Sequence, residues 1–410
     1  MKRVAIYSLL LILGLVASQF TPVLLGDQYR VGYEIIQFFT MVALAFIMTH
    51  VGFEFDIDKR NLRQYGWDYV VAATAAAFPW ILCCLYFVFV LVDRQAWGQW
   101  DVWKESLLAS RFAAPTSAGV LFSMLAAAGL ASTWLFRKAR ILAIFDDLDT
   151  VLLMIPLKMA MVGFRWQLGV IVVVMAIMLA IAYRYLHRVR LPVTWPWFMG
   201  YSLVIVVVTE IVYWASKSVS PDIPIHIEVL LPAFVLGCIL RRPSDDHALD
   251  SGHGHAGGGH SQSRSEELAL ATVSGVFMVL VGLSMPPVVG EAAARVAEAA
   301  VGALAQNTPA LGWGAIAMHV LVLTVVSNIG KMFPLFCYRK EAHWRDRLAV
   351  CVAMWPRGEV GAGVIVLSLA YGIGGPVVVV ALLSLALNLV LTGVFITMVR
   401  RIMLSAPALA

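Results

Sequence analysis

Apolar runs long enough to cross a lipid bilayer recur along this chain from end to end. A helix of about 20 apolar residues spans the hydrocarbon core of a bilayer, and we identify about twelve such runs. They lie at residues 4–21, 34–52, 67–92, 105–130, 140–161, 167–187, 195–216, 224–240, 267–289, 312–336, 347–371 and 376–399. The sequence is 61% hydrophobic and only 13% charged, whereas soluble domains carry about 25% charge. We therefore predict an all-α polytopic membrane protein in which residues 1–410 form a single transmembrane domain.

The lysines and arginines gather in alternate loops between these runs. Most of the 30 basic residues would face one side of the membrane, and the positive-inside rule makes that side cytoplasmic, together with both termini. The net charge of +5 is explained by these loops, so we expect the lipid bilayer and no nucleic acid as a partner. The first run follows Lys2 and Arg3, which is also the pattern of a cleaved signal peptide.

The long polar insertion at 241–267 is rich in glycine, serine and histidine. We predict a flexible cytoplasmic loop that joins two halves of the chain. Its histidines either bind Zn²⁺ or Ni²⁺ weakly or are incidental; they are His247, His253, His255 and His260. The phosphate-binding pattern G-x-G-x-x-G after a strand does not occur, so we expect no nucleotide and no cofactor. The five cysteines have no metal-site spacing and are interpreted as small buried apolar residues.

An aspartate doublet, Asp146 and Asp147, lies in the middle of the run at 140–161. One aspartate at the centre of a membrane helix costs roughly 2.5 to 3.5 kcal/mol, and such residues usually mark an ion or proton path. Asp149 follows on the same helix and shares a face with Asp146, while Asp147 points about 100° away. Asp149 either lines a water-filled funnel or pairs locally.

Lys331 is a basic residue within the run at 312–336. A buried lysine that has no carboxylate beside it would lose its proton, so an aspartate of another span is the natural counter-charge. We prefer Asp146 as that partner. The alternative is that Lys331 extends its amine to the membrane interface.

Two apolar runs are interrupted by proline, glycine and polar residues. The segment SRFAAPTSAGVL contains Thr116 and Ser117, and the segment WPRGEVGAGV contains Arg357 and Glu359. Proline and glycine at membrane depth indicate broken helices that line a cavity, and paired broken helices are typical of transporter sites. A simple proline kink in the first segment and a cytoplasmic helix end in the second are the alternatives.

Taken with FDDLD and Lys331, the segments PTSAG and PRGEVG make the chain resemble the monovalent cation/proton antiporter superfamily. The similarity is to the sodium/hydrogen exchanger membrane domain, in particular its electrogenic bacterial type, and it covers nearly the whole chain. FEFDIDKRNLRQYG and FMVLVGLSMPP also look like segments of that family. The chain departs from the family pattern at Asp149, since a third acid is unusual, and in the bulky ILAIF before the doublet.

The resemblance implies a fold of inverted repeats with two crossing broken helices. A core bundle would comprise about 67–161 and 312–399, and a dimerisation bundle about 4–52 and 167–289. It further implies a homodimer in a bacterial inner membrane.

The resemblance also implies roles for the individual residues. Asp147 would carry both the sodium ion and the proton, and Asp146, at the same ion site, would pair with Lys331. Arg357 and Glu359 would be structural charges near the helix crossing, and Thr116 and Ser117 would belong to an unwound segment at the site. The implied function is secondary active, electrogenic sodium/proton antiport for pH homeostasis, by alternating access at the aspartate pair. The protein would be a transporter and no enzyme, would need no cofactor, and would carry Na⁺ or Li⁺ and protons.

Other classes of protein remain as alternatives. A potassium/proton antiporter or an organic-anion symporter would use a related fold. A divalent-metal transporter would use the histidine-rich loop, yet His50 and His319 are isolated within the spans. An intramembrane aspartyl protease needs two acids on separate helices, which FDD does not offer, and a channel or sensor is a further alternative. The carried ion, the stoichiometry and the pH of activation are left open.

Overall fold

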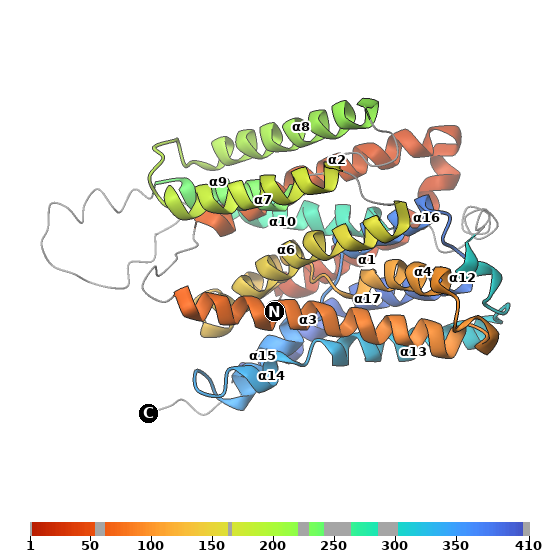
Figure 1. Ribbon diagram of the computed structural model, residues 1–410. Coiled ribbons are helices and arrows are strands. Elements are labelled where there is room, and N and C mark those ends of the chain that lie inside the picture. Colours follow the sequence, from red (N-terminus) through yellow and green to blue (C-terminus); the bar gives the residue numbers. More distant parts are fainter. Residues whose placement is uncertain are drawn as a thin grey trace, which may run out of the picture. The chain divides into compact units, whose positions relative to one another are not determined.

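The computed structural model describes residues 2–53, 62–162, 166–219, 229–241, 264–285 and 302–404 (Figure 1). Within these ranges every named element is a helix, as the composition predicts. The four histidines of the polar insertion, His247, His253, His255 and His260, lie outside the described residues.

Single helices account for most of the predicted spans. They are α1 (Lys2–Leu25), α2 (Tyr29–Phe53), α3 (Leu62–Tyr86), α6 (Trp134–Val162), α7 (Trp166–Arg184), α8 (Trp195–Val219), α9 (Leu230–Ile239), α10 (Arg264–Leu283), α13 (Trp313–Gly330) and α17 (Pro376–Leu404). In the part of the chain that the structure describes, 7 helical segments are long and apolar enough to cross a membrane. Helix α6 is 29 residues long, but the acidic residues near its middle make it less apolar than these.

The predicted fourth and eleventh spans are broken helices. The fourth consists of α4 (Trp100–Ser110), a 3₁₀ turn at Arg111–Ala113 and α5 (Ala118–Ala127), and the eleventh consists of α15 (Trp344–Ala353) and α16 (Glu359–Ala370). Between the helices of each span the backbone is irregular, at residues 114–117 and 354–358. Both breaks coincide with the interrupted apolar segments of the sequence.

The tenth span contains a break that the sequence analysis did not anticipate. A continuous run over 312–336 was expected, whereas α13 ends at Gly330 and a short helix, α14, begins at Pro334. Proline has no backbone N–H and favours the first turn of a new helix. Lys331 is the C-terminal cap of α13. A positive charge is favourable at this end of a helix, because the helix dipole is negative there.

The helices form two compact units. Unit 1 comprises Met1–Ile36, Asn61–Gly163 and Met278–Ala410, and unit 2 comprises Gln37–Arg60 and Phe164–Phe277. All the predicted site residues belong to unit 1. The assignment of a core bundle and a dimerisation bundle stays a prediction.

In unit 1, helices α3 and α13 lie side by side (Figure 1). A Cβ atom on Gly330 would lie 2.5 Å from Cα of Pro79, so only glycine permits this approach of the two backbones. The contact fixes the end of α13 and with it the position of Lys331. Nearer the other end of α13, Nδ1 of His319 is hydrogen-bonded to the hydroxyl of Tyr86 at 2.7 Å.

Unit 2 has an apolar core around Phe46, Phe198 and Leu240. The ring of His50 packs in this core, with centroids 4.9 Å from Phe46 and 4.4 Å from Phe198. An imidazole among aromatic rings contributes packing, and among the described residues no group of three or more His, Cys, Asp and Glu is arranged to hold a metal ion.

Candidate ion-binding site

The middle of α6 presents three buried carboxylates. The side chains of Asp146, Asp147 and Asp149 are 0%, 7% and 2% exposed. Burial of a carboxylate is costly unless charged or hydrogen-bonding groups surround it. The partners of these acids therefore define the site.

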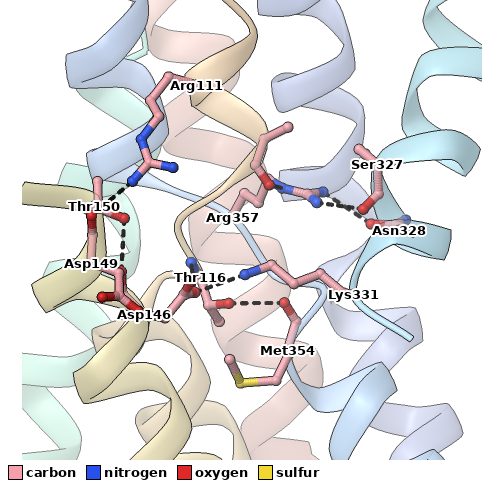
Figure 2. Close-up of polar contacts among 11 residues, drawn as sticks. Arg111, Thr116, Asp146, Asp149, Thr150, Ser327, Asn328, Lys331, Met354 and Arg357 are labelled. Atoms are coloured by element: carbon pink, nitrogen blue, oxygen red, sulfur yellow. Dashed lines mark hydrogen bonds and ion pairs between the residues drawn. The ribbon is translucent and has the colours of Figure 1, made fainter. Parts of the chain in front are cut away.

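Asp146 is held from two directions by hydrogen bonds to one of its oxygens. Its Oδ2 atom accepts a bond from Nζ of Lys331 at 2.8 Å and from the backbone amide of Thr116 at 2.8 Å (Figure 2). Lys331 is fully buried, so it does not reach the membrane interface. The structure thus brings together Asp146 and Lys331, the pair preferred from the sequence, across 185 positions of the chain.

The two broken helices meet at this point. The Thr116 hydroxyl donates to the carbonyl oxygen of Met354 at 3.0 Å, and the backbone amide of Ser117 donates to the carbonyl oxygen of Pro356 at 3.0 Å. Each break therefore supplies partners for backbone groups of the other, as irregular backbone at membrane depth requires. This contact makes the two interrupted segments cross.

Arg357 ties the crossing to α13. Its guanidinium is fully buried and donates to three acceptors at 3.0 Å: the carbonyl oxygen of Ala113, Oδ1 of Asn328 and the carbonyl oxygen of Ser327 (Figure 2). Two of these acceptors are main-chain carbonyls. Glu359, expected beside Arg357, is the first residue of α16, but its side chain lies outside the described part of the structure.

Asp147 lies next to Asp146 on α6 and is buried. Its negative charge acts on Lys331. Lys331 therefore interacts electrostatically with both aspartates, although it is hydrogen-bonded only to Asp146 among the two.

Arg111 is a site residue that the sequence analysis missed. Its guanidinium is fully buried and donates from Nη2 to the backbone oxygen of Asp149 at 3.0 Å (Figure 2). The side chain of Asp149 interacts electrostatically with that of Tyr69 on α3. An arginine inside an apolar run is itself a signal of function. Arg111 belongs to the segment SRFAAPTSAGVL, which the sequence analysis selected only for its proline and hydroxyl residues.

The described charges of the site balance. Three fully or nearly buried acids face three fully buried bases, and these are Asp146, Asp147, Asp149, Arg111, Lys331 and Arg357. The bases act electrostatically on the acids. Charges of opposite sign that lie together are less costly to bury than a lone charge.

A broken-helix crossing beside buried, paired charges within an all-α polytopic membrane protein defines the class of ion-coupled secondary transporters. The chain belongs to the family described as sodium/hydrogen exchanger, transmembrane, because residues 2–401 match it. This is a transporter family, so the chain is an integral membrane protein of a cation/proton antiport family.

A solved structure supports the fold. The sodium proton antiporter MjNhaP1 from Methanocaldococcus jannaschii at pH 8 is similar with a TM-score of 0.56 and 13% sequence identity, over 97% of this chain and 92% of that one. A search of the curated proteins found no match. The antiporter fold expected from the sequence is confirmed.

Proposed function

We propose that this chain is a secondary active antiporter that exchanges sodium ions for protons at the aspartate doublet, with net movement of charge. The observation that carries the proposal is the fully buried ion pair of Lys331 and Asp146, 2.8 Å apart, beside Asp147 at the crossing of two broken helices. Family membership supports cation/proton exchange. The residues and the electrogenic mode are our inference.

Asp147 is the proposed carrier. A hard monovalent cation needs oxygen ligands, and carboxylates and unwound backbone carbonyls supply them in transporters. The Asp147 carboxylate, the Thr116 oxygen and nearby carbonyls, with water, would form this set. Asp146 contributes its charge to the same site while it pairs with Lys331.

Exchange follows from competition between two loads for one site. A carboxylate that holds a proton is neutral and binds a sodium ion only weakly, and a bound sodium ion disfavours protonation of the carboxylate. Each cargo therefore displaces the other. If Lys331 also releases its proton when the cation binds, more than one proton moves for each sodium ion, and the cycle moves net charge.

Access to the site would alternate between the two sides of the membrane. We infer that the core bundle rocks against the dimerisation bundle of a homodimer, as inverted-repeat transporters do. We also infer a bacterial inner membrane with both termini in the cytoplasm, supported by the basic residues of the alternate loops. Regulation of internal pH and sodium is the corresponding physiological role.

The test uses the full-length protein in proteoliposomes with a pH dye inside. A pH gradient is imposed, and Na⁺, Li⁺ or K⁺ is added outside. We expect Na⁺ or Li⁺ to dissipate the gradient in the wild type and not in Asp147→Asn. Asp101→Asn is the matched control, because its carboxylate is exposed on α4 and its exchange should equal that of the wild type.

Charge movement is measured in the same vesicles. Valinomycin with potassium clamps the membrane potential, and it should accelerate an electrogenic exchange. Exchange driven by K⁺ alone would replace sodium with potassium as the cargo. No response to any monovalent cation, with folded protein present, would reject the antiporter proposal and favour organic-anion transport.

A further inference from the structure

The turn that carries Lys331 is not part of a long helix. Helix α13 ends at Gly330, and α14, which begins at Pro334, contains only 4 residues. A helix this short has little stability of its own, so the position of the turn depends on the groups that hold it from outside. Whether Lys331 lies within reach of Asp146 therefore depends on the same groups.

Helix α15 supplies these supports from one of its faces. Arg347 and Cys351 of α15, together with its C-terminal cap Met354, follow the spacing i, i+4, i+7. This spacing places the three residues on one side of a helix. The helices α14 and α15 are packed against each other (Figure 1), so this side of α15 can reach the turn.

Arg347 and Cys351 hold the turn through its main chain. The guanidinium of Arg347 donates from Nη1 to the carbonyl oxygen of Leu335. The thiol of Cys351 is fully buried and lies 3.6 Å from the carbonyl oxygen of Met332. A thiol is a weak donor, whereas a hydrogen bond from a charged group is strong. Arg347 is therefore the main anchor of the turn.

The same helix supports the other group that donates to Asp146. The carbonyl oxygen of Met354, at the end of α15, accepts a hydrogen bond from the hydroxyl of Thr116. The backbone amide of Thr116 donates to Oδ2 of Asp146, and so does Nζ of Lys331 (Figure 2). From Arg347 to Met354 the helix rises about 10 Å. One helix thus sets the spacing of the two groups that meet on this oxygen.

We propose that Arg347 is a positioning residue for antiport, which holds the turn so that the ammonium of Lys331 stays on Asp146. The ammonium and a sodium ion are both cations, so they repel each other and compete for the same carboxylates. A turn that is held less firmly lets the ammonium leave more easily. A sodium ion then binds more tightly and leaves more slowly. This inference rests on the proposed function, because it concerns the counter-charge of the same site.

The first test is the exchange assay in proteoliposomes, with rates normalised to folded, monodisperse protein. Arg347→Met removes the donor and the charge but keeps a long side chain. We expect the Na⁺ concentration for half-maximal exchange to fall several-fold and the maximal rate to fall with it. Arg347→Lys keeps a charged donor and should move both values back towards those of the wild type. A folded Arg347→Met with wild-type values overturns the proposal.

Arg339→Met is the matched control. Arg339 is exposed in the connection between α14 and α15, so this variant removes a positive charge from the same part of the chain without touching the turn. Its half-maximal Na⁺ concentration and its maximal rate should equal those of the wild type. Values that change as much as those of Arg347→Met would mean that surface charge causes the effect, against the proposal.

The second test separates a role through Lys331 from general stabilisation of the fold. Arg347→Met is made in the wild type and in Lys331→Gln/Asp146→Asn, which lacks the ion pair, and unfolding temperatures are measured in detergent. Residues that act through each other have non-additive effects. Arg347→Met should therefore lower the unfolding temperature less in the second background. Equal decreases would show that Arg347 only stabilises the fold, and would overturn the proposal.

Cys351 offers a milder variant if Arg347→Met does not fold. Cys351→Ala removes only the weak thiol contact and should lower the half-maximal Na⁺ concentration by a smaller factor, whereas Cys351→Ser keeps a donor and should resemble the wild type. An unchanged value in folded Cys351→Ala then overturns the proposal. Failure of the proposed function looks different, since wild-type vesicles would show no exchange, while the comparison of unfolding temperatures needs no transport.

Discussion

Gly358 packs directly against Ser117 where the two broken helices cross. A Cβ atom on Gly358 would lie 2.9 Å from Oγ of Ser117 and 3.1 Å from its Cβ atom. Contacts this short do not occur between real side chains without displacement of one of them. Gly358 therefore allows the fourth and eleventh spans to approach as closely as their backbone hydrogen bond requires.

Gly358→Ala should separate the two broken helices and slow exchange. Overpacking of a well-packed interior costs about 1–3 kcal/mol, so the unfolding temperature in detergent should fall as well. Gly363→Ala is the matched control, because a Cβ atom there meets no atom within 4 Å and alanine favours a helix. Equal exchange rates for the two variants would contradict the close packing at the crossing.

Lys331→Gln should destabilise the protein strongly by leaving the Asp146 carboxylate without its ion pair. Removal of one partner of a buried pair costs about 3–5 kcal/mol. The double variant Lys331→Gln/Asp146→Asn has no lone charge and should unfold at a higher temperature than Lys331→Gln. Thermal unfolding followed by loss of monodisperse protein measures both, and a double variant less stable than the single one would argue against the pair.

Arg357→Lys should weaken the crossing although it keeps the charge. An ammonium group cannot reproduce the planar arrangement through which the guanidinium reaches Ala113, Asn328 and Ser327. A buried acceptor left unpaired costs about 1–3 kcal/mol, and the apparent unfolding temperature should drop accordingly. Arg137→Lys on the exposed side of α6 is the control and should leave that temperature unchanged.

Lys138 is the centre of a second buried ion cluster in unit 1. Its Nζ lies 2.8 Å from Oδ1 of Asp68 on α3 and 3.0 Å from Oε2 of Glu341, and 4.5 Å from the ring centroid of Tyr338. The cluster joins α3, α6 and the segment before α15.

Lys138→Gln should therefore destabilise unit 1 by about 3 kcal/mol, since it leaves the buried carboxylate of Asp68 unpaired. Arg137→Gln removes an exposed charge from the neighbouring position and should change stability little. The unfolding temperatures of the two variants, measured in parallel, test this prediction. Similar behaviour of both would mean that the cluster contributes little.

Much of the site could be predicted from the sequence because unpaired charge in an apolar run is costly. That argument selects Asp146 and Lys331 and leaves few partners for each, and the two interrupted runs locate the crossing. The break after Lys331 was missed, although Pro334 signals it, since the apolar run continues on both sides. Arg111 was missed because its partners are a backbone carbonyl and the face of Trp80, neither of which leaves a pattern of charges in the sequence.

The hydrogen bond from Arg357 to Ala113 spans 244 positions of the chain. During synthesis, the fourth and fifth spans enter the membrane long before the eleventh emerges from the ribosome. The acids of α6 must therefore stay in the membrane without Lys331 and Arg357 for that interval, a state that a carboxylate tolerates best when it holds a proton. Insertion of this protein accordingly depends on the order in which its charges arrive, and the site exists only once the last third of the chain has been made.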